Sequence, residues 1–154
     1  MSSSRLTVLM AAMSGVLAAC GSTSDPSSSQ PAAGKCVNET RAEPFSAGVT
    51  FEGTHGVSVS LMDSNPAPPA QGDNKWTLEV KESGTEIADA TITAEQKMVD
   101  HGHPGSKRIG VTSLGAGSYE ATPVNFNMAG YWTTTFHVKT ATVEDDVVVK
   151  LCIP

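Results

Sequence analysis

The sequence predicts an all-β domain over residues 36–154, a two-sheet β-sandwich of about seven or eight antiparallel strands. No apolar pattern with helical spacing extends over the length of an ordinary helix. The apolar runs are short and rich in Val, Thr, Ile and aromatic residues, and several alternate apolar with polar positions, as half-buried strands do. Gly, Pro, Asn and Ser separate them at intervals of about eight to twelve residues, as turns separate the strands of a sandwich.

The predicted strands follow one another with short connections. In chain order they are 49–51, 56–62, 75–81, 88–96, 108–112, 118–126, 131–139 and 146–153. The connection 63–74 contains Pro66, Pro68, Pro69 and Gly72, and we expect a surface loop there because proline cannot donate to a ladder. Pro123 lies inside a predicted strand and therefore requires a bulge or an edge position.

Alternation assigns a face to each strand residue. The residues expected to face the core are Trp76, Leu78, Val80, Ala90, Ile92, Ala94, Trp132, Phe136, Val138, Val147, Val149 and Leu151. The residues expected to face outward from strand 131–139 are Tyr131, Thr133, Thr135 and His137. His55 and the pair Asp145-Asp146 are expected in solvated turns.

A tight turn precedes Tyr119. Gly115-Ala116-Gly117-Ser118-Tyr119 resembles the tyrosine corner of immunoglobulin-like domains, in which a tyrosine near the start of a strand binds upstream backbone. The resemblance implies an immunoglobulin-like sandwich, with the Tyr119 hydroxyl bonded to backbone near Leu114. Ala121 stands where those domains often have a core cysteine, so no bridge between the sheets is expected there.

The N-terminus predicts export and lipid attachment. Residues 1–19 have a positive Arg5 and a short apolar segment, which is typical of a secretory signal peptide. Leu17-Ala18-Ala19-Cys20 resembles a bacterial lipobox, which implies cleavage before Cys20 and diacylglyceryl attachment to its sulfur. The alternative is an ordinary signal peptide with a free Cys20.

Residues 20–35 form a predicted disordered linker of small and polar residues. As a flexible coil it would span roughly 20 Å and hold the domain close to the membrane. Gly21 follows the cysteine, and in diderm bacteria lipoproteins without Asp at that position generally go to the outer membrane. We therefore expect a lipid-anchored cell-envelope protein.

Composition limits the partners. The formal net charge is −6 and no basic patch is apparent, which argues against nucleic acid and anionic lipid surfaces. The chain has no Gly-x-Ser-x-Gly motif, paired-carboxylate motif or phosphate-binding loop, and we expect no enzymatic activity.

Cys36 and Cys152 stand at the two ends of the predicted domain. In an oxidising compartment we expect them to form a disulfide. Metal binding by two thiolates is the alternative, although no Cys-x-x-Cys motif supports it.

Two loops carry the candidate functional residues. If the strands alternate in direction, the loop after 88–96 and the loop before 131–139 lie at one end of the sandwich, where such domains usually carry function. These loops contain Met98, His101, His103 and Met128. His137 would lie near the other end, facing out.

The same segments carry a resemblance to a known family. The ordered occurrence of Ala90, 98–103, 117–119 and 128–132 resembles the YtkA-like or FixH-like domain of the bacterial envelope, over about residues 75–153. The family commonly has proline where Val99 stands. The resemblance implies a small immunoglobulin-like sandwich, with some members associated with copper handling or oxidase assembly.

Imidazole suits copper and zinc, and thioether selects Cu(I). A metal site formed by Met98, His101, His103 and Met128 is therefore one hypothesis, with copper favoured over zinc because only Asp100 is near enough to add an oxygen ligand. The alternative is a protein-interaction or structural lipoprotein, in which the histidines cap backbone groups and Met128 fills the core.

Overall fold

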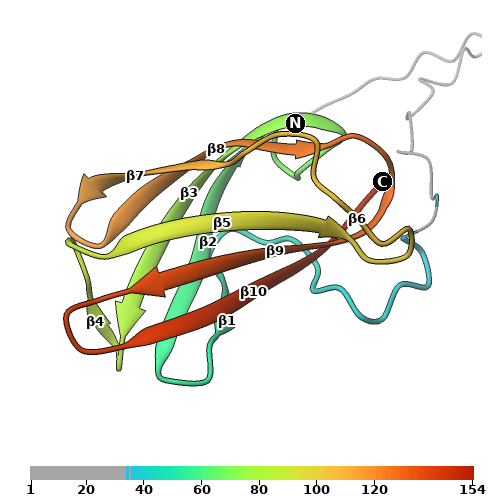
Figure 1. Ribbon diagram of the computed structural model, residues 1–154. Coiled ribbons are helices and arrows are strands. Elements are labelled where there is room, and N and C mark those ends of the chain that lie inside the picture. Colours follow the sequence, from blue (N-terminus) through green and yellow to red (C-terminus); the bar gives the residue numbers. More distant parts are fainter. Residues whose placement is uncertain (1–33, 35) are drawn as a thin grey trace, which may run out of the picture.

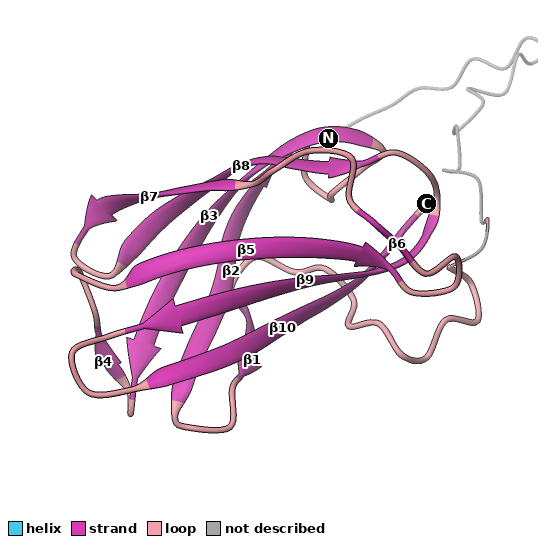
Figure 2. Cartoon of the chain, in the orientation of Figure 1, coloured by secondary structure: helices cyan, strands magenta, loops and turns pink. Residues whose placement is uncertain are grey.

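The computed structural model describes Gly34 and residues 36–154. The predicted signal peptide, Cys20 and nearly all of the linker lie outside the described residues. The described part contains strands, turns and bends but no helix (Figure 2), so no described helix is long and apolar enough to cross a bilayer.

Ten strands form the domain. They are β1 (Val49–Glu52), β2 (Val57–Asn65), β3 (Gly72–Glu82), β4 (Thr85–Glu86), β5 (Thr91–Met98), β6 (His103–Pro104), β7 (Gly110–Gly115), β8 (Ser118–Phe126), β9 (Gly130–Lys139) and β10 (Glu144–Ile153). Because β4 and β6 have two residues each, eight longer strands remain, as the sequence predicted.

The strands form two antiparallel sheets packed face to face (Figure 1). One sheet has the order β1-β2-β3-β8-β7, with β4 paired to β3. The other has the order β10-β9-β5-β6. The chain crosses between the sheets from β4 to β5, from β6 to β7 and from β8 to β9. An isolated bridge between Ala94 of β5 and Ile109, just before β7, also joins the two layers. The β-sandwich prediction is confirmed.

Most residues that alternation assigned to the core are buried in it, whereas Ala90, Ile92 and Ala94 are only partly buried. Trp76, Trp132, Tyr119, Phe126 and Phe136 are its largest fully buried side chains. The Trp76 and Phe126 ring centroids are 5.9 Å apart within one sheet, and the Phe126 and Trp132 centroids are 5.5 Å apart across the two sheets. Burial of such apolar area provides most of the driving force for folding.

Two expectations about connections need correction, and the expectation for Pro123 is confirmed. The loop expected at 63–74 is shorter, because β2 extends to Asn65 and β3 begins at Gly72. Buried Asn74 supports this short loop by bonding both the N–H and the C=O of Ala70. The strand expected at 88–96 begins at Thr91 and includes Met98. Pro123 lies at a bulge, where the β3–β8 register shifts between Asn74 and Trp76.

Tyr119 binds a different backbone segment from the one expected. Its hydroxyl donates to the Ile87 carbonyl at 2.7 Å and accepts from the Ala90 N–H at 3.0 Å. Both partners lie between β4 and β5, whereas the tyrosine-corner resemblance placed them near Leu114. The hydroxyl reaches this segment because β8 pairs with β3, which precedes it in the chain.

Cys36 and Cys152 form a disulfide, 116 residues apart in the sequence. It ties the segment before β1 to the end of β10. The predicted bridge is confirmed.

Candidate functional site

The two candidate loops meet at one end of the sandwich, which we call the histidine pole. β5 and β9 pair antiparallel from Thr91 opposite Lys139 to Met98 opposite Trp132. The end of β5 therefore lies beside the start of β9, and the bend before β9 adjoins the loop after β5 (Figure 1). His137 pairs with Thr93, toward the opposite pole.

Trp132 stands at the centre of this arrangement. It is 1% exposed and lies opposite Met98 in the β5–β9 register. Its ring centroid is 5.9 Å from that of His103, and its indole N–H donates to the Met128 carbonyl at 3.0 Å. The His103 ring, the Met128 backbone and the cross-strand position of Met98 therefore all adjoin one buried indole.

Residues 99–105, the histidine loop, form a tight bend. The Gly102 N–H donates to the Met98 carbonyl at 2.9 Å, and Gly102 has φ +70°, a conformation that glycine adopts without steric cost. The chain then returns to pair His103 with Met98. The His101 and His103 ring centroids are 5.9 Å apart in an edge-to-face arrangement. The two imidazoles are therefore neighbours.

The hydrogen bond of His103 indicates which tautomer its neutral ring adopts. Its Nδ1 lies 3.0 Å from the Pro104 carbonyl oxygen. Because a carbonyl oxygen can only accept, the Nδ1 carries the hydrogen and the neutral ring keeps its lone pair on Nε2. Metal-binding histidines are commonly oriented in this way, through a hydrogen bond from the ring nitrogen that does not bind the metal.

The two methionines lie on the core side of the loops. Met98 is 1% exposed, and its methyl lies 2.7 Å from the position a Cβ on Gly130 would occupy. Met128 is partly buried and packs against the core. His101 is exposed and His103 half-buried, so the imidazoles reach solvent while the methionines pack toward the core.

Acidic side chains offer few oxygen ligands for a metal ion at the histidine pole. Asp100, the only acidic residue expected near the histidines, forms an ion pair with Arg41 at 2.9 Å. Across the described residues, no three His, Cys, Asp or Glu side chains come together in a way that could hold a metal ion. A zinc site of the usual kind needs three or four such ligands.

A polar network holds the far end of the histidine loop. The Gly105 N–H donates to the Gln96 carbonyl at 2.9 Å, and the Asn125 N–H donates to Gln96 Oε1 at 3.2 Å. The Ser106 hydroxyl donates to Asn125 Oδ1 at 2.6 Å, and Asn125 Nδ2 donates to Asp73 at 2.5 Å. These bonds join the loop to β3 and β8.

The opposite pole has a cavity of about 590 Å³, lined in part by His55, His137 and Asp145. Its charged groups are already paired with one another. His137 Nδ1 lies 2.7 Å from Asp146 Oδ1, and Lys139 contacts Glu144. The expectation of a solvated Asp145 is wrong, because its side chain is buried and bonded to backbone at residues 54–57.

Sequence reasoning missed two residues of the histidine pole. Trp132 was assigned only to the core. Its position just after Met128-Ala129-Gly130 could have indicated that it lies beside the candidate loops. Arg41 had no local signal, because its contacts with Asp100 and Tyr131 depend on the disulfide-linked segment before β1. That segment also buries Tyr131, which is 6% exposed although alternation placed it outward.

Comparison with solved structures gives a distant match. A copper-bound variant of FetP from uropathogenic Escherichia coli aligns with a TM-score of 0.45 and 12% sequence identity, covering 70% of this chain and 90% of that chain. No curated protein matches this sequence. The YtkA-like family model matches residues 52–137, beginning earlier and ending earlier than the region expected from the motifs. Because that match covers more than half of the sequence, the chain belongs to the YtkA-like family.

Proposed function

We propose that this protein is an exported, lipid-anchored module of the cell envelope that binds copper at the histidine pole, without enzymatic activity of its own. One observation carries the proposal. The His101 and His103 rings are neighbours, the His103 ring packs edge-to-face on Trp132, and the chain at Met98 and Met128 adjoins the same indole through strand pairing and a backbone hydrogen bond. Two adjacent imidazoles beside loops that also carry two methionines supply the nitrogen and sulfur donors that copper accepts.

The donor set fits copper better than zinc. The Nε2 of His103 and a nitrogen of His101 would be the outer ligands, and the Met98 thioether beneath them would be the inner one. Imidazole and thioether together favour Cu(I), which is soft and accepts few ligands. Met128 would contribute a second sulfur or remain a core residue. Copper is here the cargo, and the protein holds it.

The envelope location is supported by two features. Cys36 and Cys152 are paired, and structural disulfides persist in oxidising compartments. The N-terminal sequence has the form of a lipoprotein signal, which would tether the domain to a membrane through Cys20. A module held there could exchange copper with another envelope protein.

Calorimetry with Cu(I) and with Cu(II) on the purified protein tests the proposal. We expect wild-type protein to bind Cu(I) and the double variant His101→Ala/His103→Ala to lose binding. His137→Ala removes an imidazole at the opposite pole and should bind as wild type does. Binding no tighter than about 10 μM in the wild type would exclude the copper site and favour a protein-interaction role instead.

A further inference from the structure

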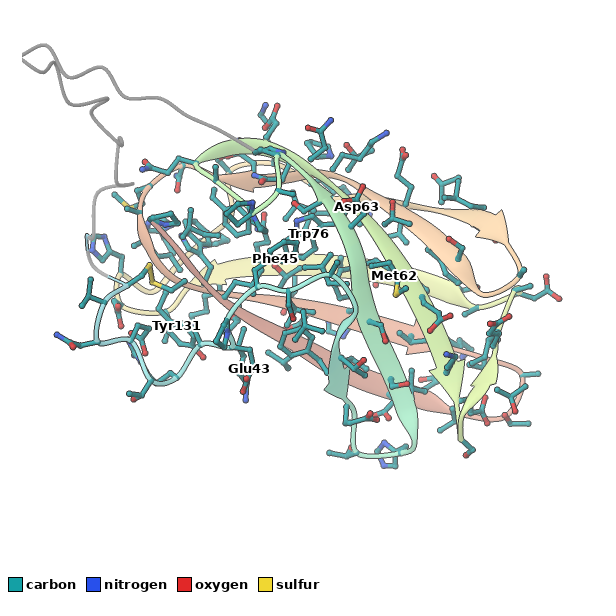
Figure 3. All side chains as sticks on the ribbon, turned by 180° about the vertical axis from the view of Figure 1, so that it is seen from behind. Glu43, Phe45, Met62, Asp63, Trp76 and Tyr131 are labelled. Atoms are coloured by element: carbon teal, nitrogen blue, oxygen red, sulfur yellow. A yellow bond between two sulfur atoms is a disulfide. The ribbon has the colours of Figure 1, made fainter. Side chains whose placement is uncertain are left out.

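We propose that the segment before β1 positions the histidine loop, with Arg41 as the positioning residue. We call residues 36–47 the strap. It is tied to β10 by the disulfide from Cys36 to Cys152 and by the Glu43 N–H, which donates to the Lys150 carbonyl at 2.9 Å. Figure 3 shows the strap passing the Tyr131 side chain on the outside of the sandwich.

Arg41 is held among three partners. Its guanidinium carbon lies 4.4 Å from the centroid of the Tyr131 ring, a cation–π geometry. Its Nε donates to Glu39 Oε1 at 2.8 Å, and the hydrogen bonds from Arg41 lower the pKa of Glu39 to about 2. Its terminal nitrogen lies 2.9 Å from Asp100 Oδ1. The guanidinium therefore contacts the strap, β9 and the histidine loop at once.

The ion pair with Asp100 joins Arg41 directly to the histidine loop. Asp100 precedes His101 in the histidine loop, and the Val99 N–H donates to the Tyr131 carbonyl at 3.2 Å. Arg41 therefore contacts both the loop, through Asp100, and the strand beside it, through Tyr131. The loop cannot swing away from β9 while both contacts hold.

The two ends of the histidine loop are thus restrained by different elements. The Gln96–Asn125 network holds the end that follows Pro104, and the strap holds the end that precedes His101. The imidazoles lie between the two restraints. Holding a loop in its binding conformation raises affinity because less conformational entropy is lost on binding.

The first test needs no copper. Amide hydrogen exchange is measured by NMR on the full chain, in wild type and in Arg41→Ala. Loss of the Arg41–Asp100 ion pair should raise the exchange rates of the Val99 and Gly102 amides by about twofold to fivefold. The amides of Gly53 and Thr140, hydrogen-bonded at the opposite pole, should not change.

Matched variants distinguish the effect of losing the Arg41–Asp100 contact from the effect of losing any surface ion pair. Lys75→Ala removes an ion pair with Glu120 on the other sheet and should leave exchange at Val99 and Gly102 unchanged. Asp100→Asn should reproduce the effect of Arg41→Ala, and the double variant should add little to either. Unchanged exchange at Val99 and Gly102 in Arg41→Ala would overturn the proposal.

The second test uses copper and rests on the proposed function. Arg41→Ala should weaken Cu(I) affinity by about twofold to fivefold, with an unchanged midpoint of urea unfolding. Equal affinity in Arg41→Ala and wild type would contradict a positioning role. Wild-type protein that binds no copper would refute the proposed function, whereas the exchange measurement would still decide whether the strap holds the loop.

Discussion

The carboxylate of Asp145 accepts a hydrogen bond from the backbone N–H of His55 at 2.7 Å, joining the two sheets at the opposite pole. The N–H groups of Thr54, Val57 and Asp146 bind the same carboxylate at 2.9, 3.2 and 2.9 Å. Burial by itself would raise the pKa of Asp145, but these backbone N–H groups lower it to about 2. A buried charge is tolerated here because peptide N–H groups solvate it.

Asp145→Asn should destabilise the fold. The amide cannot accept at the nitrogen that replaces one oxygen, so backbone N–H groups lose their partner, at a cost of about 2–3 kcal/mol in the free energy of unfolding. Urea denaturation measures the change. Asp146→Asn, at the exposed neighbouring position, is the matched control and should change stability little. Equal stability of the two variants would contradict the assigned role of Asp145.

The stability contributed by Asp145 should depend on pH. Its folded-state pKa of about 2 is below the ordinary value of 3.8, so the contribution is fully present above about pH 4 and is lost as pH falls through 2. The shift corresponds to a loss on the order of 2 kcal/mol. Comparing unfolding at pH 6 and pH 2.5 in wild type and Asp145→Asn isolates this residue, and the wild type should lose more stability.

Gly53→Ala should be strongly destabilising. A Cβ at Gly53 would lie 2.3 Å from Asp145 Oδ2, and the carboxylate cannot retreat without breaking its backbone hydrogen bonds. We expect a loss of about 2–3 kcal/mol from this overpacking. Gly48→Ala is the control, since nothing lies within 4 Å of its added Cβ and only backbone strain at φ +85° remains. Thermal unfolding of both variants would measure the difference.

Tyr119→Phe should destabilise the protein by about 1–3 kcal/mol. The variant keeps the buried ring but leaves the Ile87 carbonyl and the Ala90 N–H without the hydroxyl. Tyr131→Phe, which keeps the ring beneath Arg41, is the control and should cost less. Should the two variants unfold at the same urea concentration, the hydroxyl of Tyr119 would have no structural role.

The double variant Cys36→Ser/Cys152→Ser should be less stable by up to about 4–5 kcal/mol, the chain-entropy value for a loop of 116 residues. Equilibrium unfolding with and without the bridge tests this. A thiol titration of the unreduced wild-type protein should find neither Cys36 nor Cys152 reactive. Two reactive thiols would show that the bridge is absent.

The sequence by itself determined the strands and most of their faces. Alternation along Trp76, Leu78 and Val80, or along Val147, Val149 and Leu151, predicts burial because a strand presents successive side chains to opposite faces. The predicted order of strands also placed the two candidate loops at one pole, because every second connection between strands that alternate in direction lies at the same end of the sandwich. These are consequences of local geometry and can be read from neighbouring residues.

Only the tertiary structure decided which side chains meet. Arg41 forms an ion pair with Asp100, and the strap covers Tyr131. Asp145 accepts hydrogen bonds from backbone about ninety residues away. Trp132 becomes the centre of the candidate site because β5 pairs with β9, while β7 and β8, which lie between them in the chain, pair in the other sheet. Such contacts join distant segments, and no residue pattern near either partner records them, because they depend on the order in which strands pair.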